Sequence, residues 1–271
     1  ASSSKSGGAV THTTSGGYGG DGPPPAHLDG WTPAERDEEK GIKARKDDLK
    51  GVRLGIFRDH FNDASKEVVD MADAAVEKLE RRGATIVEIA IPNLHALQLS
   101  HGITISSEFS WAHDRETTNG WPIEPSTAIQ LAIGRSLTAV EVHAANRLRS
   151  WGMEMINQLF ESERLDAIVT PTVARTAPVL TSGMRASGAS DTALVVELMK
   201  HIFLANLLGL PALSVPLGLG AETSLPIGLQ LIGSWWEEGK LLRLAKALDA
   251  DGSTPRPKLF HDHLDGLMVG G

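Results

Sequence analysis

The side chains that could carry out covalent chemistry in this chain include three serines and a lysine at its start. Ser2, Ser3 and Ser4 precede Lys5. A neutral lysine beside a serine can act as the base that activates a serine nucleophile. Catalysis also requires that the two groups be held in a fixed reacting geometry. Adjacent residues in a segment with few apolar side chains cannot be held that way, so we assign them no catalytic role.

Three other short stretches resemble functional motifs. Residues 15–20 read SGGYGG, like a loop that stabilises an oxyanion, but they lack paired serines and lie beside three prolines, so we interpret them as a linker. The alternating side chains of His261-Asp262-His263 resemble metal ligands, but two histidines with no third ligand nearby make a weak site. Ser106-Ser107-Glu108 is expected to have a structural or pocket-edge role. We therefore predict no metal site and no cofactor.

The remaining polar groupings favour ordinary structural roles. His101, His113 and His143 are scattered, and we expect them at the surface or hydrogen-bonded in the interior. The mixed charges of residues 35–48 are typical of a solvated segment.

Composition excludes several classes of protein. The 271 residues include no cysteine, which rules out disulfides and thiolate chemistry. The net charge is −8 and no basic cluster stands out, so we expect no nucleic-acid partner. No apolar run approaches the roughly 18 residues of a membrane span, and the start does not resemble a secretory signal. We expect a location in the cytoplasm or at the periphery of endomembranes, not secretion.

The composition changes along the chain and indicates three parts. Residues 1–49 are rich in glycine, proline and charge, which predicts a loop-rich arm with little core. Residues 50–250 carry the periodic apolar patterns of a folded domain, and residues 251–271 form a polar tail.

The folded part begins with a strand–helix–strand pattern. Residues 52–57 and 84–91 read as strands, and residues 66–82 read as a helix with Val68, Ala72, Val76 and Leu79 on its buried face. Short connections of this kind predict parallel pairing and an α/β class with a mixed sheet flanked by helices.

From residue 138 on, the sequence predicts three helices and three strands. Thr138 and Glu141 have the spacing of a capping box, which opens a helix reaching about residue 163. Its predicted buried stripe is Val142, Ala145, Leu148, Gly152, Met155, Ile156 and Leu159. Residues 93–125 are predicted to be helix and then loop. Residues 166–170, 212–215 and 227–232 read as strands, and residues 194–208 as one helix. The last helix, residues 238–248, is predicted to point Leu241, Leu242, Ala245 and Leu248 inward.

Three blocks in this half carry a family resemblance. They are DAIVTPTVARTAP from residue 166, ANLLGLPALSVPLGL from residue 205 and LPIGLQLIG from residue 225. In this order and spacing they resemble the C-terminal half of the amidase-signature hydrolases, over roughly residues 50–250. ELMKHIFLANLLG, from residue 197, is similar to the branch of plant and fungal fatty acid amide hydrolases. The resemblance implies the C-terminal portion of the amidase-signature fold.

The resemblance also implies a reaction, the hydrolysis of carboxylic or N-acyl amides such as N-acylethanolamines, by a lysine and two serines. In the family these residues lie upstream of the matched segment, the nucleophile in a GGSSGGS-like stretch that this sequence lacks. We therefore assign no catalytic residue here and expect no activity from this chain alone. The alternatives are a non-catalytic, truncated homologue that binds lipid or a partner chain, and the branch that amidates glutamate on transfer RNA.

A substrate pocket is the remaining site prediction. The resemblance implies that the helix before the GLPA turn borders the channel for the acyl chain. The candidate pocket residues are Thr170, Thr172, Met199, His201, Ile202 and Asn206. Trp235 and Trp236 are expected to cover an apolar opening or to cap the last helix. The predicted partners are a lipid amide or other small amide, if the upstream half of the family fold completes the site, and a second copy of the chain as a homo-oligomer.

Overall fold

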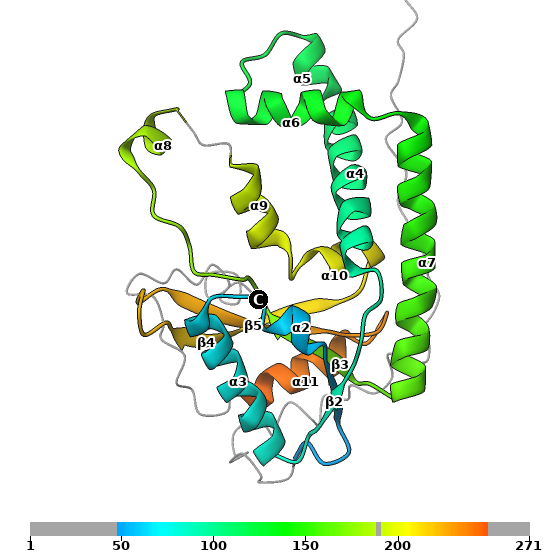
Figure 1. The fold of residues 1–271 in the computed structure, drawn as a ribbon, viewed down its shortest axis with the longest axis vertical. Helices are drawn as coiled ribbons and strands as arrows, with labels where there is room; N and C mark the ends of the chain where they lie inside the picture. The colour runs from blue at the N-terminus through cyan, green and yellow to red at the C-terminus, as the bar shows by residue number, and fades with distance from the viewer. Residues whose placement is uncertain (1–47, 188–190, 249–271) are drawn as a thin grey trace, which may run out of the picture. The chain divides into compact units, whose positions relative to one another are not determined.

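The computed structural model describes residues 48–187 and 191–248 (Figure 1). The predicted tail and, apart from residues 48 and 49, the predicted arm therefore lie outside the described residues. So do the candidates Ser2 to Lys5, residues 15–20 and His261-Asp262-His263. No helix within the described part of the chain has the length and apolar character needed to cross a bilayer.

The described strands form one mixed sheet in the order β2-β1-β3-β5-β4. β1 pairs in parallel with both β2 and β3, whereas β5 pairs antiparallel with β3 and β4. The strands are β1 (Arg53–Ile56), β2 (Thr85–Glu88), β3 (Ala167–Pro171), β4 (Ala212–Leu219) and β5 (Pro226–Ile232). The predicted α/β class, with a mixed sheet flanked by helices, is confirmed.

The strands near the start of the domain are shorter than the apolar runs that predict them. β1 has four residues, so its parallel pairing with β2 is limited to Thr85–Glu88. Ile89 still donates its N–H to the carbonyl oxygen of Ile56, and the chain then leaves the sheet. Beyond that point the apolar side chains Ile89 and Ile91 are buried against helices instead.

One face of the sheet packs against α3 (Lys66–Arg81) and α11 (Glu238–Leu248). The predicted stripe of α3 is confirmed, since all four of its residues are buried. The predicted stripe of α11 is wrong at Leu242, which is 59% exposed, while Leu244 and Ala247 are buried. Positions i, i+3 and i+7 share one side of a helix, so Leu244 joins Leu241 and Leu248, and Leu242 turns away.

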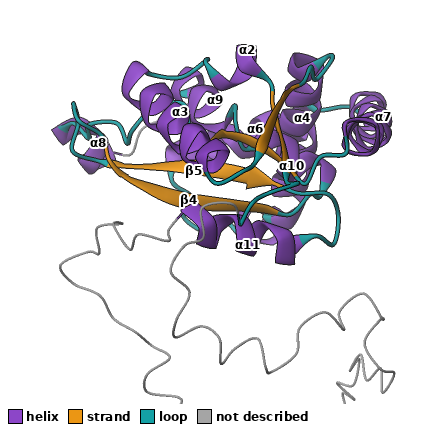
Figure 2. Ribbon diagram, turned by 90° about the horizontal axis from the view of Figure 1, so that it is seen from below, coloured by secondary structure: helices purple, strands orange, loops and turns teal. Residues whose placement is uncertain are grey.

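The other face packs against α4 (Leu94–Ala112), α7 (Ala139–Glu163) and α10 (Phe203–Leu208). The capping box of α7 is present, with Thr138 and Glu141 each bonded to the other's backbone N–H. Within the predicted stripe of α7, Ala145, Gly152 and Ile156 are fully buried and the other four residues are half-buried. Figure 2 shows α4 and α7 on the opposite side of β4 and β5 from α11.

The remaining helices are α2 (Arg58–Phe61), α5 (Asp114–Thr118), α6 (Pro125–Ser136), α8 (Ser182–Ser187) and α9 (Thr192–Met199). The prediction of one helix over residues 194–208 is wrong, because Lys200–Ile202 separate α9 from α10. The break contains Lys200 and His201, between the apolar residues Met199 and Ile202. α10 ends where expected, at Gly209, whose φ of 70° is the left-handed conformation that glycine adopts without strain.

The close packing of α6 on α4 depends on the absence of a side chain at Gly134. A Cβ atom there would overlap the Ser110 hydroxyl and the Ser106 carbonyl group. Gly102 of α4, by contrast, has open space around the same position.

We expect Gly134→Ala to lower the free energy of unfolding by about 1–3 kcal/mol, because backbone and side chain must move apart. The matched change Gly102→Ala is expected to leave it unchanged or raise it by about 0.5–1 kcal/mol, because alanine favours a helix interior over glycine. Urea unfolding followed by circular dichroism measures both. Equal effects of the two substitutions would contradict the packing described here.

Candidate functional site

The sheet face that packs on α10 becomes polar toward one end of its strands. Three rows cross β3, β5 and β4 in register. The first row is apolar, the second is polar and the third carries a hydroxyl, a glycine and a proline. The rows are Ile168–Ile232–Ala212, Thr170–Gln230–Ser214 and Thr172–Gly228–Pro216; Thr172 directly follows β3 and donates its N–H to the Gly228 carbonyl oxygen. Thr170 and Gln230 are buried, so the second row requires hydrogen-bond partners.

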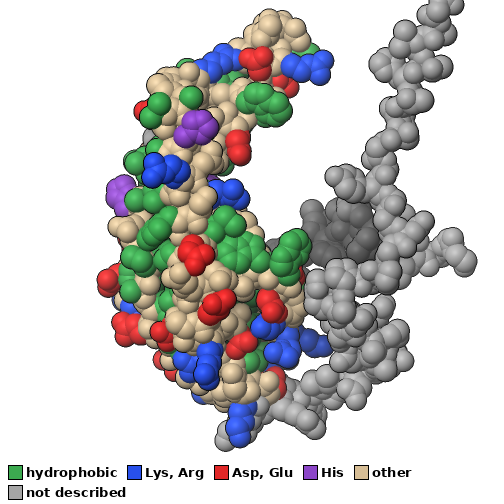
Figure 3. Space-filling model, turned by 90° about the vertical axis from the view of Figure 1, so that its right-hand side faces the viewer, with side chains coloured by type: hydrophobic (Ala, Val, Ile, Leu, Met, Phe, Trp, Pro, Cys, Tyr) green, Lys and Arg blue, Asp and Glu red, His purple; other side chains and the backbone are tan. Residues whose placement is uncertain are grey.

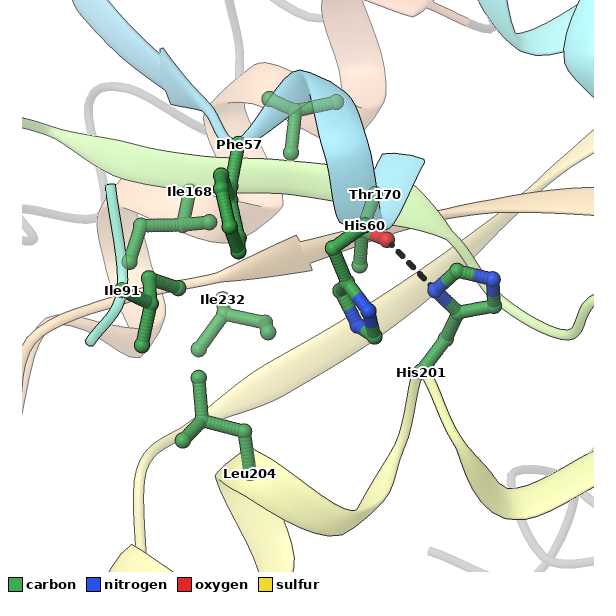
Figure 4. Close-up of a pocket in the computed structure, with 9 residues that line it drawn as sticks. Phe57, His60, Ile91, Ile168, Thr170, His201, Leu204 and Ile232 are labelled. Carbon is green, nitrogen blue, oxygen red and sulfur yellow. Dashed lines mark hydrogen bonds between the residues drawn. The ribbon is translucent and has the colours of Figure 1, made fainter. Parts of the chain in front are cut away.

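His201, in the break between α9 and α10, supplies those partners (Figure 4). Its Nε2 donates to the carbonyl oxygen of Asp63 at 3.3 Å. In the neutral ring Nδ1 is then the acceptor, and it receives the Thr170 hydroxyl at 3.1 Å. Gln230 donates its side-chain amide to the His201 carbonyl oxygen at 2.8 Å. His201 thereby joins two strands to the turn between α2 and α3.

A second histidine, His60 of α2, lies against His201 with the ring centroids 4.5 Å apart. Burial lowers the pKa of His60 to about 4, although Asp63 partly opposes the shift. Burial, and then the neighbouring His60, lower the pKa of His201 to about 3. Both rings are therefore neutral near pH 7. The charges that face them are Asp63 and Lys200, which form an ion pair at 2.6 Å, and the hydrogen bond from Lys200 lowers the pKa of Asp63.

The two histidines border a small cavity of about 10 Å³, which is at the lower limit for one water molecule. Apart from Thr170, its other walls are apolar side chains, including Phe57, Ile91 and Leu204. A space of this size does not admit an organic substrate. In residues 48–187 and 191–248, no three histidine or acidic side chains are placed to hold a metal ion.

A larger polar groove of about 470 Å³ lies beside this cluster. Two ion pairs border it, Lys200 with Asp63 and Arg175 with Glu197 at 3.2 Å. Buried Glu67 closes another side. Its carboxylate accepts hydrogen bonds from the Thr176 hydroxyl, from the Thr223 hydroxyl and N–H, and from the N–H of Glu222. Glu67 thus fixes the turn between β4 and β5 to the start of α3.

The structure brings only some of the predicted pocket residues together. Thr170 and His201 share a hydrogen bond and line the small cavity. Thr172 lies one row further along, with its hydroxyl 2.7 Å from that of Ser214. Met199 and Ile202 are half-buried beside the helix break, and Asn206 is exposed on α10. Their role in a substrate pocket stays a prediction.

The other sequence candidates have structural partners or are exposed. Buried Ser106 accepts a hydrogen bond from Gln130 at 2.9 Å, while Glu108 is exposed. His101 is buried with its ring beside Phe203, His113 is half-buried and His143 is exposed. Trp235 donates its indole N–H to the Leu208 carbonyl oxygen at 3.1 Å, and Trp236 is 80% exposed.

Sequence reasoning missed His60, Asp63, Lys200 and Gln230. Lys200 and Gln230 lie within blocks that carry the family resemblance, but nothing local in the sequence indicates their partners, which are far apart in the chain. The sole signal was the group of charged and aromatic residues FRDHFND at 57–63, directly after a predicted strand.

Comparison with known proteins places this fold in a family. A model of the family described as Amidase matches residues 26–242, which is most of the chain. The chain belongs to the amidase family. Among curated amidases, the fatty acid amide hydrolase of Medicago truncatula is 37% identical over 224 residues, which is 80% of this chain and 36% of that protein. A glutamyl-tRNA(Gln) amidotransferase subunit of Halothermothrix orenii is 26% identical over 254 residues, 84% of this chain and 52% of that one.

A solved structure agrees with the fold. The 6-aminohexanoate cyclic dimer hydrolase in complex with substrate has a TM-score of 0.62 at 18% identity, over 82% of this chain and 51% of that chain. This amidase chain spans about a third of the length of its plant relative.

We expect Thr170→Val to lower the free energy of unfolding by about 1–3 kcal/mol, because it leaves the buried Nδ1 of His201 without a donor. The matched change Thr172→Val removes a hydroxyl in a more exposed pair and is expected to cost less than about 0.5 kcal/mol. Chemical unfolding of both variants at pH 7 measures the difference. If Thr172→Val were as costly as Thr170→Val, the buried hydrogen bond would not be the cause.

We expect stability to decrease as the pH falls from 7 to 5. Unfolded histidines, with a pKa of about 6.5, take up protons that folded His60 and His201 do not, with pKa values of about 4 and 3. Each such proton lowers the free energy of unfolding by at most about 1.4 kcal/mol per pH unit. Unfolding at several pH values measures the slope. His60→Phe should flatten it, while His143→Phe on the exposed side of α7 should not. An unchanged slope in His60→Phe would contradict the assignment.

Proposed function

We propose that this chain is the scaffold and substrate-channel portion of an amidase that hydrolyses amides of fatty acids. The observation that carries the proposal is the pattern of similarity. The chain is 33–37% identical to curated plant fatty acid amide hydrolases over 80% of its length, against 24–28% for amidotransferase subunits. The amidotransferase branch is therefore the weaker candidate.

The character of α9 supports an apolar substrate. Its sequence TALVVELM is almost wholly apolar, yet Val195 and Val196 are each about half exposed. An exposed apolar helix beside a polar groove suits a ligand with a long hydrocarbon chain and a small polar head. The loop before α8 adds Val179, which is 86% exposed.

In this proposal the paired histidines have a positioning role. Their ring nitrogens either bond protein groups or border a cavity too small for a substrate. Protonation of either ring near neutral pH is opposed by burial. His201 acts by holding α9 and α10 at a fixed angle to the sheet, and the catalytic lysine and serines of the reaction are assigned to no residue of this chain.

The alternative is a non-catalytic homologue that binds lipid or a partner chain. It is favoured by the same exposed apolar side chains on α9, because they could serve lipid binding without any chemistry. The two functions differ in whether a complete amidase that includes this chain turns over substrate.

The test is co-expression of the 271-residue chain with the portion of the Medicago truncatula relative that it does not match. We expect hydrolysis of oleamide by the pair, faster than hydrolysis of acetamide, and inhibition by a serine-reactive fluorophosphonate. The chain alone is expected to give no hydrolysis above the buffer blank.

Two results would contradict this proposal. Fluorophosphonate-sensitive hydrolysis by the purified chain alone would show that its own serines are catalytic. A stable pair that binds oleamide but never hydrolyses it would favour the non-catalytic alternative.

A further inference from the structure

A pocket of about 250 Å³ is formed by α5, the loop after it and the first half of α6. Figure 1 shows these two helices at the end of α4 farthest from the sheet. The pocket shares no lining residue with the small cavity or the polar groove described above. Pockets of about 300–1,000 Å³ hold drug-sized molecules, so this space suits a smaller ligand. Its apolar walls are Trp121, Pro122, Ile123 and Leu131.

The end of α5 places Trp121 at this pocket. Trp121 donates its N–H to the Glu116 carbonyl oxygen at 3.0 Å, and Gly120 donates to the Thr117 carbonyl oxygen at 3.2 Å. This pair of hydrogen bonds is a Schellman motif, which needs a left-handed residue, and Gly120 has a φ of 66°. The motif holds Trp121 beside Glu116, whose side chain lines the same pocket. The indole is 58% exposed, so its surface is open to a ligand.

One negative charge of the pocket belongs to a helix cap. Glu124 accepts hydrogen bonds from the N–H groups of Ser126 and Thr127 at the start of α6. The hydrogen bonds from Ser126, that of its hydroxyl foremost, lower the pKa of Glu124. Its carboxylate is therefore ionised near pH 7.

A second carboxylate, that of Glu116, has an oxygen without a partner. Its Oε2 is buried and accepts no hydrogen bond from the described residues. The Nδ1 of His113 is 3.9 Å from this oxygen, which is too far for a hydrogen bond. No lysine or arginine is among the described residues that line the pocket, and Arg135 in the adjoining groove is paired with Asp114 at 3.7 Å. Burying a charge without a counter-charge is costly, so the pocket favours a cation.

We propose that this pocket binds a small organic cation that carries a methylated ammonium group. The methyl groups match the apolar walls, and the positive charge is attracted both by the face of the indole and by the two carboxylates. Such a group needs no hydrogen-bond acceptor, which suits a carboxylate whose free oxygen is buried. The same carboxylates repel a phosphate attached to the ligand, so the structure favours a free cation over a phospholipid head group. The inference does not depend on the proposed function.

The experiment is calorimetric titration of the full 271-residue chain with three probes. They are choline, its uncharged isostere 3,3-dimethylbutan-1-ol, and phosphocholine. We expect choline to bind with a stoichiometry of one and a dissociation constant of about 1 mM or lower. The isostere should bind about tenfold more weakly, because it lacks the charge, and phosphocholine should also bind more weakly than choline.

Two pairs of variants locate the site. Glu116→Gln removes the charge at constant shape, and Trp121→Leu removes the aromatic face, so each should weaken the binding of choline about tenfold. The matched controls are Glu108→Gln and Trp111→Leu, because both residues are exposed on α4 and neither lines the pocket. They should leave the affinity unchanged. Thermal unfolding of each variant shows whether it is folded.

Four outcomes would overturn the proposal. They are the absence of choline binding in the millimolar range, equal affinities for choline and its isostere, tighter binding of phosphocholine than of choline, and equal effects of the pocket variants and their controls. Hydrolysis of oleamide is measured separately. Failure of either result therefore leaves the other unaffected.

Discussion

The need to hydrogen-bond a buried imidazole organises this domain. His201 is 1% exposed, and each ring nitrogen and the carbonyl oxygen has a partner on a different element: β3, the turn between α2 and α3, and β5. A buried polar group left without a partner is costly, so these elements must meet at one point. The break that separates α9 from α10 lies at the same point. Lys200, the residue before His201, adds an ion pair to Asp63 and so joins the end of α9 to the same turn.

On the face drawn in Figure 3, Lys and Arg side chains are mixed with Asp and Glu, and hydrophobic side chains lie between them. Glu67 makes similar long-range contacts at the other end of the same turn. Its buried carboxylate accepts hydrogen bonds from Thr176 and Thr223, which are more than 100 residues away. Together the two residues hold the α2–α3 turn between the end of β3 and the turn that joins β4 to β5.

The sequence predicts the parts of this fold that depend on periodicity. The buried stripe of α3, the capping box of α7 and the parallel pairing of β1 with β2 all follow from local spacing. Periodicity reports which side of an element is covered, but it does not report a partner 138 residues away, such as the Asp63 carbonyl that binds His201. For that reason the helix break at residues 200–202 and the role of His60 were not predicted. Leu242 was misplaced because several apolar residues in α11 allow two overlapping stripes, and only the neighbouring sheet decides between them.

The reversal of strand direction at β3 has a consequence for how the chain acquires its structure. β4 and β5 are joined by a short turn, and β1 and β2 by α2 and α3, so each pair assembles from contacts that are near in sequence. β3 joins the two pairs, and its link to β1 closes a loop of more than 100 residues that contains α4 to α7, as in the hydrogen bond from Arg53 to Asp166. Closing a long loop reduces the conformational entropy of the chain before stabilising contacts can form, and such steps slow folding. During synthesis the edge of β1 that pairs with β3 therefore has no partner strand until β3 has been made.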